Sequence, residues 1–271
     1  MDKINVIKVG GAVVENEASL KELINQFATM PGYKVLVHGG GRSATRIAAQ
    51  LGIESRMVGG RRITDEDMLQ VVTMVYGGLV NKRIVAALQA KGVNAIGLTG
   101  ADMDIIRSHK REPKMVTMDD GTQEMVDFGF VGDVDHANGQ RLASLVKAKD
   151  RIEAAVPVVA PLTHDGMGNI LNTNADTMAA TVAKALTEEF DVTLTYCFEK
   201  PGVMADAEDD DSVIPSINTE SYARLKADGI VSGGMIPKLD NAFDSISSGV
   251  KRVVITHFMD IQASMGTVIE K

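Results

Sequence analysis

The chain has 271 residues, which is long enough for one large α/β domain or two modest ones with a substantial core. It carries 28 Lys and Arg residues against 36 Asp and Glu residues, a formal net charge of −8. This acidic balance argues against a nucleic-acid-binding or membrane-surface protein, because both kinds depend on basic patches. A small anionic substrate stays open, since a local cluster of basic side chains is enough to bind one.

The single cysteine and the start of the chain bear on the compartment. Cys197 is the only cysteine, so no disulfide can form within the chain. Its neighbours Tyr196 and Phe198 predict a strand, and a buried, unreactive thiol is a better interpretation than a nucleophile. The sequence begins directly with a predicted strand, and no apolar run approaches about 20 residues, so we expect neither a signal peptide nor a membrane span. The expectation is a cytoplasmic protein.

The first strand and turn predict an anion site. Residues 5–9 form a short apolar strand broken by Lys8, and Gly10 and Gly11 follow directly. A lysine at the tip of a buried strand is unfavourable unless an anion such as phosphate neutralises it. Glycines let backbone N–H groups approach phosphoryl oxygens, and a helix beginning just beyond them would add its positive end. The alternative is an ordinary turn with a surface lysine, which this short motif by itself favours.

The same arrangement occurs a second time. Residues 20–27 carry apolar side chains at helical spacing, and residues 34–37 form the next apolar strand. His38 and Gly39–Gly41 follow that strand, and another helical pattern begins after them and ends at Gly52. Ligands of open α/β sheets bind outside the carboxyl ends of the strands, so we expect the two glycine loops to face one crevice.

Arg62 lies just before the next predicted helix. Thr64 is expected to cap that helix, with Asp67 three residues later, and apolar periodicity then continues over 68–88 with a bend near Gly77. Beside a helix start, Arg62 is well placed to hold a substrate carboxylate in a bidentate pair. A solvated surface arginine is an equally good interpretation of this residue alone.

Residues 93–98 predict a further strand, after which the helical period disappears between 102 and about 138. Charged residues, glycines and short β-prone pairs alternate there, which is typical of hairpins that stand off a main sheet. Lids over substrates are commonly built this way, so we expect a β-hairpin lid region, with a decorative insertion as the alternative. The core pattern resumes at 156–160.

Polar residues cluster where a long helix begins in the second half of the chain. Asn172, Asn174 and Asp176 are either plain capping residues or a polar group that points into the crevice. A strand over 192–196 follows, and the acidic run 208–211 is most simply a solvated loop rather than a metal site.

A third glycine turn brings in a second lysine. Gly233 and Gly234 precede Lys238 at the start of another helical pattern, and a final strand is expected over 252–256. Strands alternate with helices along nearly the whole chain, which predicts an α/β fold, a three-layer αβα sandwich around a mainly parallel open sheet. Nothing resembling a repeat or a linker divides the sequence, so we expect one domain.

Lys8, Asp176 and Lys238 all lie where the crevice is expected. Phosphoryl transfer asks the protein mainly for alignment and for neutralisation of charge on the moving group, and two lysines held apart by one aspartate meet that demand. The common nucleotide-binding, serine hydrolase and zinc signatures are missing, and the five histidines are scattered. A nucleotide site in this chain must therefore have another design.

Five motifs follow one another in a family-specific order. They are I-K-x-G-G at Ile7–Gly11, H-G-G-G at His38–Gly41, G-x-R-[IV]-T-D at Gly60–Asp65, N-x-N-A-D at Asn172–Asp176 and G-G-M-I-x-K at Gly233–Lys238. With these motifs the chain resembles the N-acetylglutamate kinases of the amino-acid kinase family over essentially its whole length. The resemblance implies ATP-dependent phosphorylation of the side-chain carboxylate of an N-acylglutamate, acetyl or succinyl, giving an acyl phosphate in arginine biosynthesis.

The resemblance also implies roles for the residues that match. Lys8 and Lys238 would stabilise the transferring phosphoryl group, and Asp176 would organise both lysines. The substrate-binding residues would be Gly40, Gly41, Arg62, Asn172 and Asn174. The nucleotide-binding residues would be Gly10, Gly11, Glu199, Gly202, Val203, Met204, Ile230, Val231 and Ser232. Magnesium would be held mainly by the ATP phosphates, without a dedicated protein metal site.

Three features depart from the family pattern. Glu199 stands where an aspartate is common. The N-terminal helix of the hexameric, arginine-inhibited members is lacking, so we expect a homodimer that free arginine does not inhibit. Arg61 stands where leucine is usual, next to Arg62. This second cation favours an acyl group with its own carboxylate, such as succinyl, unless its side chain points to solvent.

The resemblance further implies two lobes in the single domain. Residues 1 to about 165 would form an N-lobe with the acylglutamate site and the lid, and residues from about 166 to 271 a C-lobe with the nucleotide site. Glutamate 5-kinase, aspartokinase, carbamate kinase and uridylate kinase are alternatives within the same fold, and a non-catalytic ligand-binding protein is another. The motifs at 60–65 and 172–176 favour N-acylglutamate, and retention of both lysines favours a catalyst.

Overall fold

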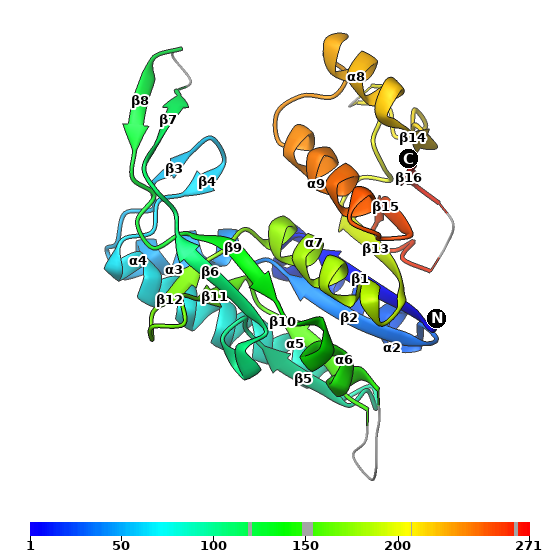
Figure 1. The fold of residues 1–271 in the computed structure, drawn as a ribbon, viewed down its shortest axis with the longest axis horizontal. Helices are drawn as coiled ribbons and strands as arrows, with labels where there is room; N and C mark the ends of the chain where they lie inside the picture. Colours follow the sequence, from blue (N-terminus) through cyan, green and yellow to red (C-terminus); the bar gives the residue numbers. More distant parts are fainter. Residues whose placement is uncertain (119–120, 148–153, 207, 263–264) are drawn as a thin grey trace.

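One large sheet organises the fold. The computed structural model describes residues 1–118, 121–147, 154–206, 208–262 and 265–271. The strands of the sheet are β1 (Lys3–Val9), β2 (Tyr33–His38), β5 (Ala95–Leu98), β10 (Val156–Val159), β13 (Asp191–Phe198), β14 (Ser216–Ile217), β15 (Arg252–His257) and β16 (Thr267–Ile269). They lie in the order β14-β16-β15-β13-β1-β2-β10-β5 (Figure 1).

Most of these strands run in the same direction. Neighbours from β15 across to β5 are parallel, and β16 is antiparallel to β15. The prediction of a mainly parallel open sheet is therefore confirmed. The strand expected from residue 93 begins at Ala95, because the Val93 N–H donates to Leu88 O and so closes the end of the preceding helix.

Helices cover both faces of this sheet. One face carries α6 (Gly139–Val146), α7 (Ala175–Ala185) and α9 (Met235–Ser247), with α8 (Thr219–Ala227) beside α9 through the stacked rings of Tyr222 and Phe243. The other face carries α1 (Gly11–Glu15), α2 (Glu17–Thr29), α3 (Gly41–Gln50), α4 (Glu66–Val72) and α5 (Asn81–Gln89). The predicted three-layer sandwich is confirmed.

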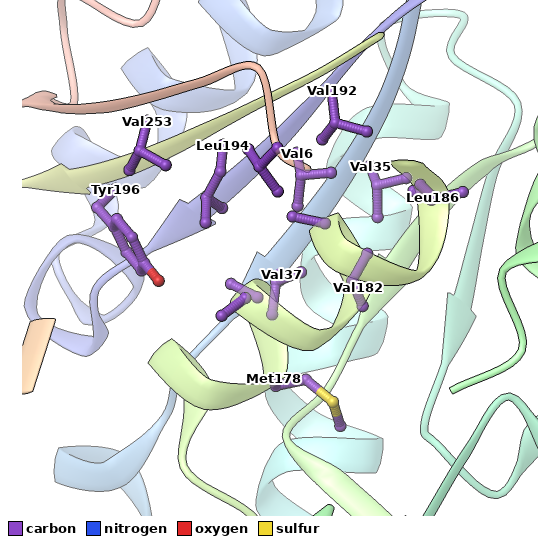
Figure 2. Packing of buried hydrophobic residues seen from close by; sticks show 14 of the residues in the cluster. Val6, Val35, Val37, Met178, Val182, Leu186, Val192, Leu194, Tyr196 and Val253 are labelled. Carbon is purple, nitrogen blue, oxygen red and sulfur yellow. The ribbon is translucent and has the colours of Figure 1, made fainter. Parts of the chain in front are cut away.

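The two cores follow from the alternation of side chains along a strand. Successive side chains point to opposite faces of the sheet, so β1 places Val6 in the core under α7 and Ile7 in the core under α2. Figure 2 shows Val6 and Val35 packed with Met178 and Val182 of α7. Lys8, two residues after Val6, therefore points to the same side as α7.

Three strands end together at one edge of the sheet. Val9 lies between His38 and Cys197 in the register of β1, β2 and β13. The glycines that follow β1 and those that follow β2 consequently begin side by side. Cys197 is fully buried, and burial raises the pKa of its thiol to about 12, as expected for an unreactive cysteine.

The helix predicted over 68–88 is continuous but changes its winding. A π-helical segment, η1 (Thr73–Val80), joins α4 to α5 and contains the glycine pair where a bend was expected. The expected cap at Thr64 was wrong by one residue, since Asp65 accepts the Met68 N–H at 2.9 Å. Thr64 is engaged elsewhere, because its backbone bonds Phe128 and Phe130.

The apolar character of this helix fits its place in the core. Within the described ranges, the helix spanning Glu66–Gln89 is long and apolar enough to cross a membrane by length and composition alone. Its apolar stretches are interrupted by polar and charged residues such as Thr73, Asn81 and Lys82. In this fold the helix lies against other core elements, with Met68, Val71 and Ile84 buried, and core helices commonly pass the same test.

Smaller sheets stand beside the main one. A four-stranded sheet contains β12 (Ile170–Asn172), β11 (Leu162–His164), β6 (Ile106–Lys110) and β9 (Gly132–Ala137) in that order. Two hairpins, β3 (Met57–Val58) with β4 (Arg61–Arg62) and β7 (Lys114–Thr117) with β8 (Gln123–Val126), project from the same end of the molecule (Figure 1). The prediction of hairpins off the main sheet between 102 and 138 is confirmed.

Candidate active site

Two lysines from opposite ends of the chain share one carboxylate. Asp176 lies in the first turn of α7, which is capped by Asn174 through hydrogen bonds from the Asp176 and Thr177 amides. Lys8 Nζ lies 2.6 Å from Asp176 Oδ1, and Lys238 Nζ lies 3.9 Å from Asp176 Oδ2. Lys8 comes from β1 and Lys238 from the start of α9, so the structure brings together the three residues proposed as catalytic.

An aromatic ring lies next to both ammonium groups. Lys8 Nζ is 5.3 Å and Lys238 Nζ 5.1 Å from the centre of the Phe198 ring. A ring face attracts cations, and its apolar body also limits their contact with water. Burial, and then the charge of Lys8, lower the pKa of Lys238, while Asp176 acts in the opposite direction. Sequence reasoning missed Phe198, although its place at the tip of β13 was a usable signal.

The two glycine loops approach each other closely at the carboxyl ends of β1 and β2. The Gly39 N–H donates to Val9 O at 3.2 Å, and a Cβ added to Gly39 would stand 3.4 Å from Gly11 N. A Cβ on Gly40 would stand 2.9 Å from the ring of Tyr76, so a larger residue does not fit there. The N-terminus of α3 begins at this point without a side-chain cap, which suits an anion.

A pocket opens beside the second glycine loop. The five residues expected to bind the substrate all line this pocket: Gly40, Gly41, Arg62, Asn172 and Asn174. The Arg62 guanidinium is largely buried and donates to Gly41 O at 2.8 Å and to Thr45 Oγ1 at 2.9 Å. Asn172 Nδ2 donates to Thr64 Oγ1 at 2.9 Å, which orients its amide.

Two further arginines line the same pocket. Arg61 lies in the pocket wall, so its side chain does not simply point to solvent. Burial lowers the pKa of Arg61, and the charge of Arg111 lowers it further. Arg111 makes a two-nitrogen ion pair with Asp133, while its buried Nη1 has no hydrogen-bond partner within the described residues. No local sequence pattern pointed to Arg111, because it reaches the pocket from the segment that joins β6 to β7.

A second cavity adjoins the first. Lys8, Gly10, Gly11, Glu199 and Lys238 line it together with Phe198, and it shares Gly41 and Gly60 with the arginine-lined pocket. A donor of a phosphoryl group in one cavity would thus lie next to an acceptor in the other. The lysine pair borders the cavity where phosphate groups would be expected.

The other predicted nucleotide residues lie outside the lining of this cavity. Val203 and Val231 are buried in the core under α7 and α9, and the Val203 N–H donates to Thr267 Oγ1. Gly202 packs closely against Thr267, whereas Ile230 and Ser232 are exposed. Their role, and that of Met204, stays a prediction.

The comparison with known families decides where the chain belongs. The sequence model described as the amino acid kinase family matches residues 3–257. The chain belongs to the amino acid kinase family. The resemblance inferred from the five motifs is thereby confirmed at the level of the family, and the α/β fold agrees with it.

Named relatives and solved structures resemble this member of the amino acid kinase family. A Bacteroides thetaiotaomicron protein named acetylglutamate kinase is 60% identical over 270 residues, which are 100% of this chain and 99% of the relative. A solved Streptococcus mutans structure matches 98% of both chains at 25% identity with a TM-score of 0.77. Neisseria gonorrhoeae N-acetylglutamate synthase, solved with coenzyme A and N-acetyl-glutamate, has a TM-score of 0.77 at 21% identity and shares the fold over 99% of this chain and 59% of its own.

Proposed function

We propose that the protein transfers the γ-phosphoryl group of ATP to the side-chain carboxylate of N-acetylglutamate, in arginine biosynthesis. The observation that carries this proposal is that Lys8 and Lys238 line the cavity adjoining the arginine-lined pocket and share the carboxylate of Asp176. Relatives at 60% identity that are named acetylglutamate kinase support it.

The chemistry follows from this geometry. An oxygen of the substrate carboxylate attacks the γ-phosphorus, the bond from phosphorus to the β,γ-bridging oxygen breaks, and ADP leaves with that oxygen. The nucleophile is already an anion near neutral pH, so the reaction needs no general base. Lys8 and Lys238 stabilise the charge on the transferring group, and Asp176 keeps the two ammonium groups at a set separation.

The phosphate groups would lie between the glycine loops and the lysines. Gly10, Gly11 and Glu199 line that cavity, and the other proposed nucleotide residues would frame the adenosine. Within the described ranges no group of three or more His, Cys, Asp or Glu side chains is arranged to hold a metal ion. Magnesium would enter with ATP, held mainly by its phosphates.

The substrate's own carboxylate and acyl group would occupy the arginine-lined pocket. Arg62 would hold the α-carboxylate and Asn172 the amide end of the substrate. With the two-lobe division expected above, the N-lobe would supply most of this pocket, and Asn172 and Asn174 would reach it from the C-lobe. The phosphate cavity would take residues from both lobes, including Lys8 from the first and Lys238 from the second, and the projecting hairpins would serve as the lid.

A coupled ADP-release assay tests the proposed reaction. We expect turnover with ATP and N-acetylglutamate, and none with unacylated glutamate, aspartate, carbamate or uridylate. Turnover with one of the other acceptors would assign the chain to another activity of this fold. An absence of ADP release with every acceptor, although ATP binds, would instead indicate a non-catalytic binding protein.

A specific observation favours a second acyl group, succinyl. Arg61 and Arg111 both line the pocket, and the buried Nη1 of Arg111 lacks a partner within the described residues. A carboxylate on the acyl group would supply that partner. Measuring kcat/KM for N-acetylglutamate and N-succinylglutamate decides between them, because a clear preference for acetyl would end this alternative.

We further propose a homodimer in the cytoplasm. Met74 and Leu79 of the long helix are exposed large apolar side chains. A second copy that covers this face would remove these groups from water. Sedimentation should give twice the chain mass of 28.9 kDa, and Leu79→Glu should lower it, whereas a monomeric wild type would refute the proposal. An arginine titration checks the accompanying prediction that arginine does not inhibit.

A further inference from the structure

A buried histidine holds the backbone of the second glycine loop. His38 ends β2, and its ring is fully buried. Its Nδ1 lies 2.8 Å from Gly39 O, and its Nε2 lies 3.1 Å from Asn81 Nδ2. A carbonyl oxygen can only accept a hydrogen bond, and an amide NH2 group can only donate one. These two contacts therefore assign the ring proton to Nδ1.

The orientation of Asn81 is set by its own partners. Its Nδ2 also donates to Val158 O at 2.9 Å, and its Oδ1 accepts from Lys82 Nζ at 3.2 Å. The amide therefore presents its NH2 group to the histidine. Burial lowers the pKa of His38 to about 4, so the ring stays neutral near pH 7 and Nε2 stays able to accept.

This contact determines where the next amide points. The peptide between Gly39 and Gly40 is trans and planar, so its N–H is directed opposite to its C=O. Because Gly39 O points at the buried ring of His38, the Gly40 N–H points away from it. A Cβ on Gly11 would stand 3.8 Å from both Gly40 N and Gly41 N, so these amides face the gap between the two glycine loops.

The backbone N–H of Gly40 has a fixed direction but no hydrogen-bond acceptor among the described residues. It donates to no acceptor within the part of the chain that the structure describes, and α3 has no side-chain cap. The ring of Tyr76 packs on the other side of Gly40 and limits its movement. An N–H that is aimed before the substrate arrives can stabilise developing negative charge without reorganisation.

We propose that His38 is a positioning residue for phosphoryl transfer, which acts by holding Gly39 O so that the Gly40 N–H is aimed at an oxygen of the reacting groups. Asn81 acts one step further away, by keeping the ring proton on Nδ1. The inference rests on the proposed reaction and on the role of Gly40 in it. If His38 merely filled space, its replacement would change stability but would not change kcat selectively.

Two amide variants separate these roles. The side-chain nitrogen that His38→Asn introduces lies near the position of Nδ1, whereas that of His38→Gln lies near Nε2. We expect His38→Gln to lower kcat at least about tenfold, with KM for N-acetylglutamate changed less than about twofold. His38→Asn should restore most of kcat. Melting temperatures of both variants report any loss of packing.

The outcomes are distinguishable from a failure of the proposed function. Equal kcat values for the two variants, either both retained or both lost, would overturn the inference about His38 as long as the wild type turns over. An inactive wild type, or a Lys8→Ala variant as active as the wild type, would instead overturn the proposed reaction.

A measurement on the unaltered protein covers the case in which neither variant folds. In 15N spectra of the five histidines, one ring should remain neutral at pH 5.5 with its proton on Nδ1. A neutral ring protonated on Nε2 at that pH, or the absence of any neutral ring, would refute the arrangement.

Discussion

The phosphoryl centre and the arginine-lined pocket carry positive charge in different ways. At the phosphoryl centre, Lys8 and Lys238 come from β1 and α9, and one carboxylate, Asp176, lies between them. In the pocket, Arg61 and Arg62 come from a two-stranded hairpin. The cations proposed to act on the reacting group therefore belong to the main sheet and its helices, whereas two of those proposed to recognise the substrate belong to a small hairpin.

This difference has a physical reason. Catalysis requires the charges to be held in place before the substrate arrives, and a buried strand held by two neighbours moves little. Recognition requires a pocket whose shape suits one particular acyl group. The sequence of a hairpin outside the core can change to alter that shape without disturbing the core. Substitutions in the two regions should therefore affect kcat and KM differently.

The largest expected effect is on the phosphoryl centre. Lys8→Ala should lower kcat by about 10²–10³-fold or more, because one of the two charges that stabilise the transferring group is lost. Steady-state kinetics with saturating ATP and N-acylglutamate measures it. A kcat within about threefold of the wild type would contradict the proposed role.

Another buried lysine offers a matched control. Lys34 is also buried in a strand, but its Nζ donates to the carbonyls of Phe27, Ala28 and Met30 at 2.8, 3.0 and 2.8 Å, at the end of α2. Lys34→Met should lower the free energy of unfolding by about 1–3 kcal/mol, because those carbonyls lose their donor, while kcat stays near that of the wild type.

The next effect concerns substrate recognition. Arg62→Lys should raise KM for the N-acylglutamate more than about tenfold, with a smaller change in kcat. An ammonium group cannot bond Gly41 O and Thr45 Oγ1 and also present a planar pair of donors to a carboxylate. Arg46→Lys, on the exposed side of α3, is the control and should change KM less than about twofold. A larger loss in kcat than in KM would place Arg62 with the phosphoryl centre instead.

The pH dependence should distinguish the two regions as well. Burial and the charge of Lys8 lower the pKa of Lys238, so this ammonium loses its proton as pH rises, below the ordinary lysine value of 10.5. We expect kcat/KM of the wild type to fall on the alkaline side for this reason. Lys238→Arg stays charged, so its alkaline fall should move to higher pH. An unchanged profile would assign the fall to another group.

The smallest effect lies outside both regions. Arg107, followed by Arg141 and His164, holds the pKa of Asp104 at about 2, below its ordinary value of 3.8. A carboxyl group with a lowered folded-state pKa stabilises the protein above its unfolded pKa and loses that contribution as pH falls from about 4 to 2. Asp104→Asn should therefore weaken the fall in melting temperature over this range and leave kcat at pH 7 unchanged. An equally steep fall in the variant would refute this account.

Much of the molecule follows from its local patterns. The alternation of strands and helices predicted the main sheet and its two layers, and the glycines after two strands predicted loops that meet at one edge. The hairpins between 102 and 138 were recognised from the loss of helical period. These features depend on the spacing of residues close together in the chain, so they can be predicted without knowing the topology of the fold.

Where local signals overlapped, the prediction was less accurate. Thr64 and Asp65 are both good capping residues, and only the tertiary contacts of Thr64 with Phe128 and Phe130 leave the cap to Asp65. The helix from 66 to 89 is apolar on both faces in part, because its exposed face carries Met74 and Leu79 in addition to the buried core residues.

The sequence alone determined the strands and the glycine loops, because both follow from local patterns. It also identified Lys8, Lys238 and Asp176 as candidate catalytic residues, because each belongs to a short motif. Only the tertiary structure decided that Phe198 lies beside both ammonium groups, that Arg111 reaches the arginine-lined pocket, and that His38 contacts Asn81. The physical reason is that such contacts join residues far apart in the chain. Strand order, register and side-chain direction set their distances, and no local pattern records these.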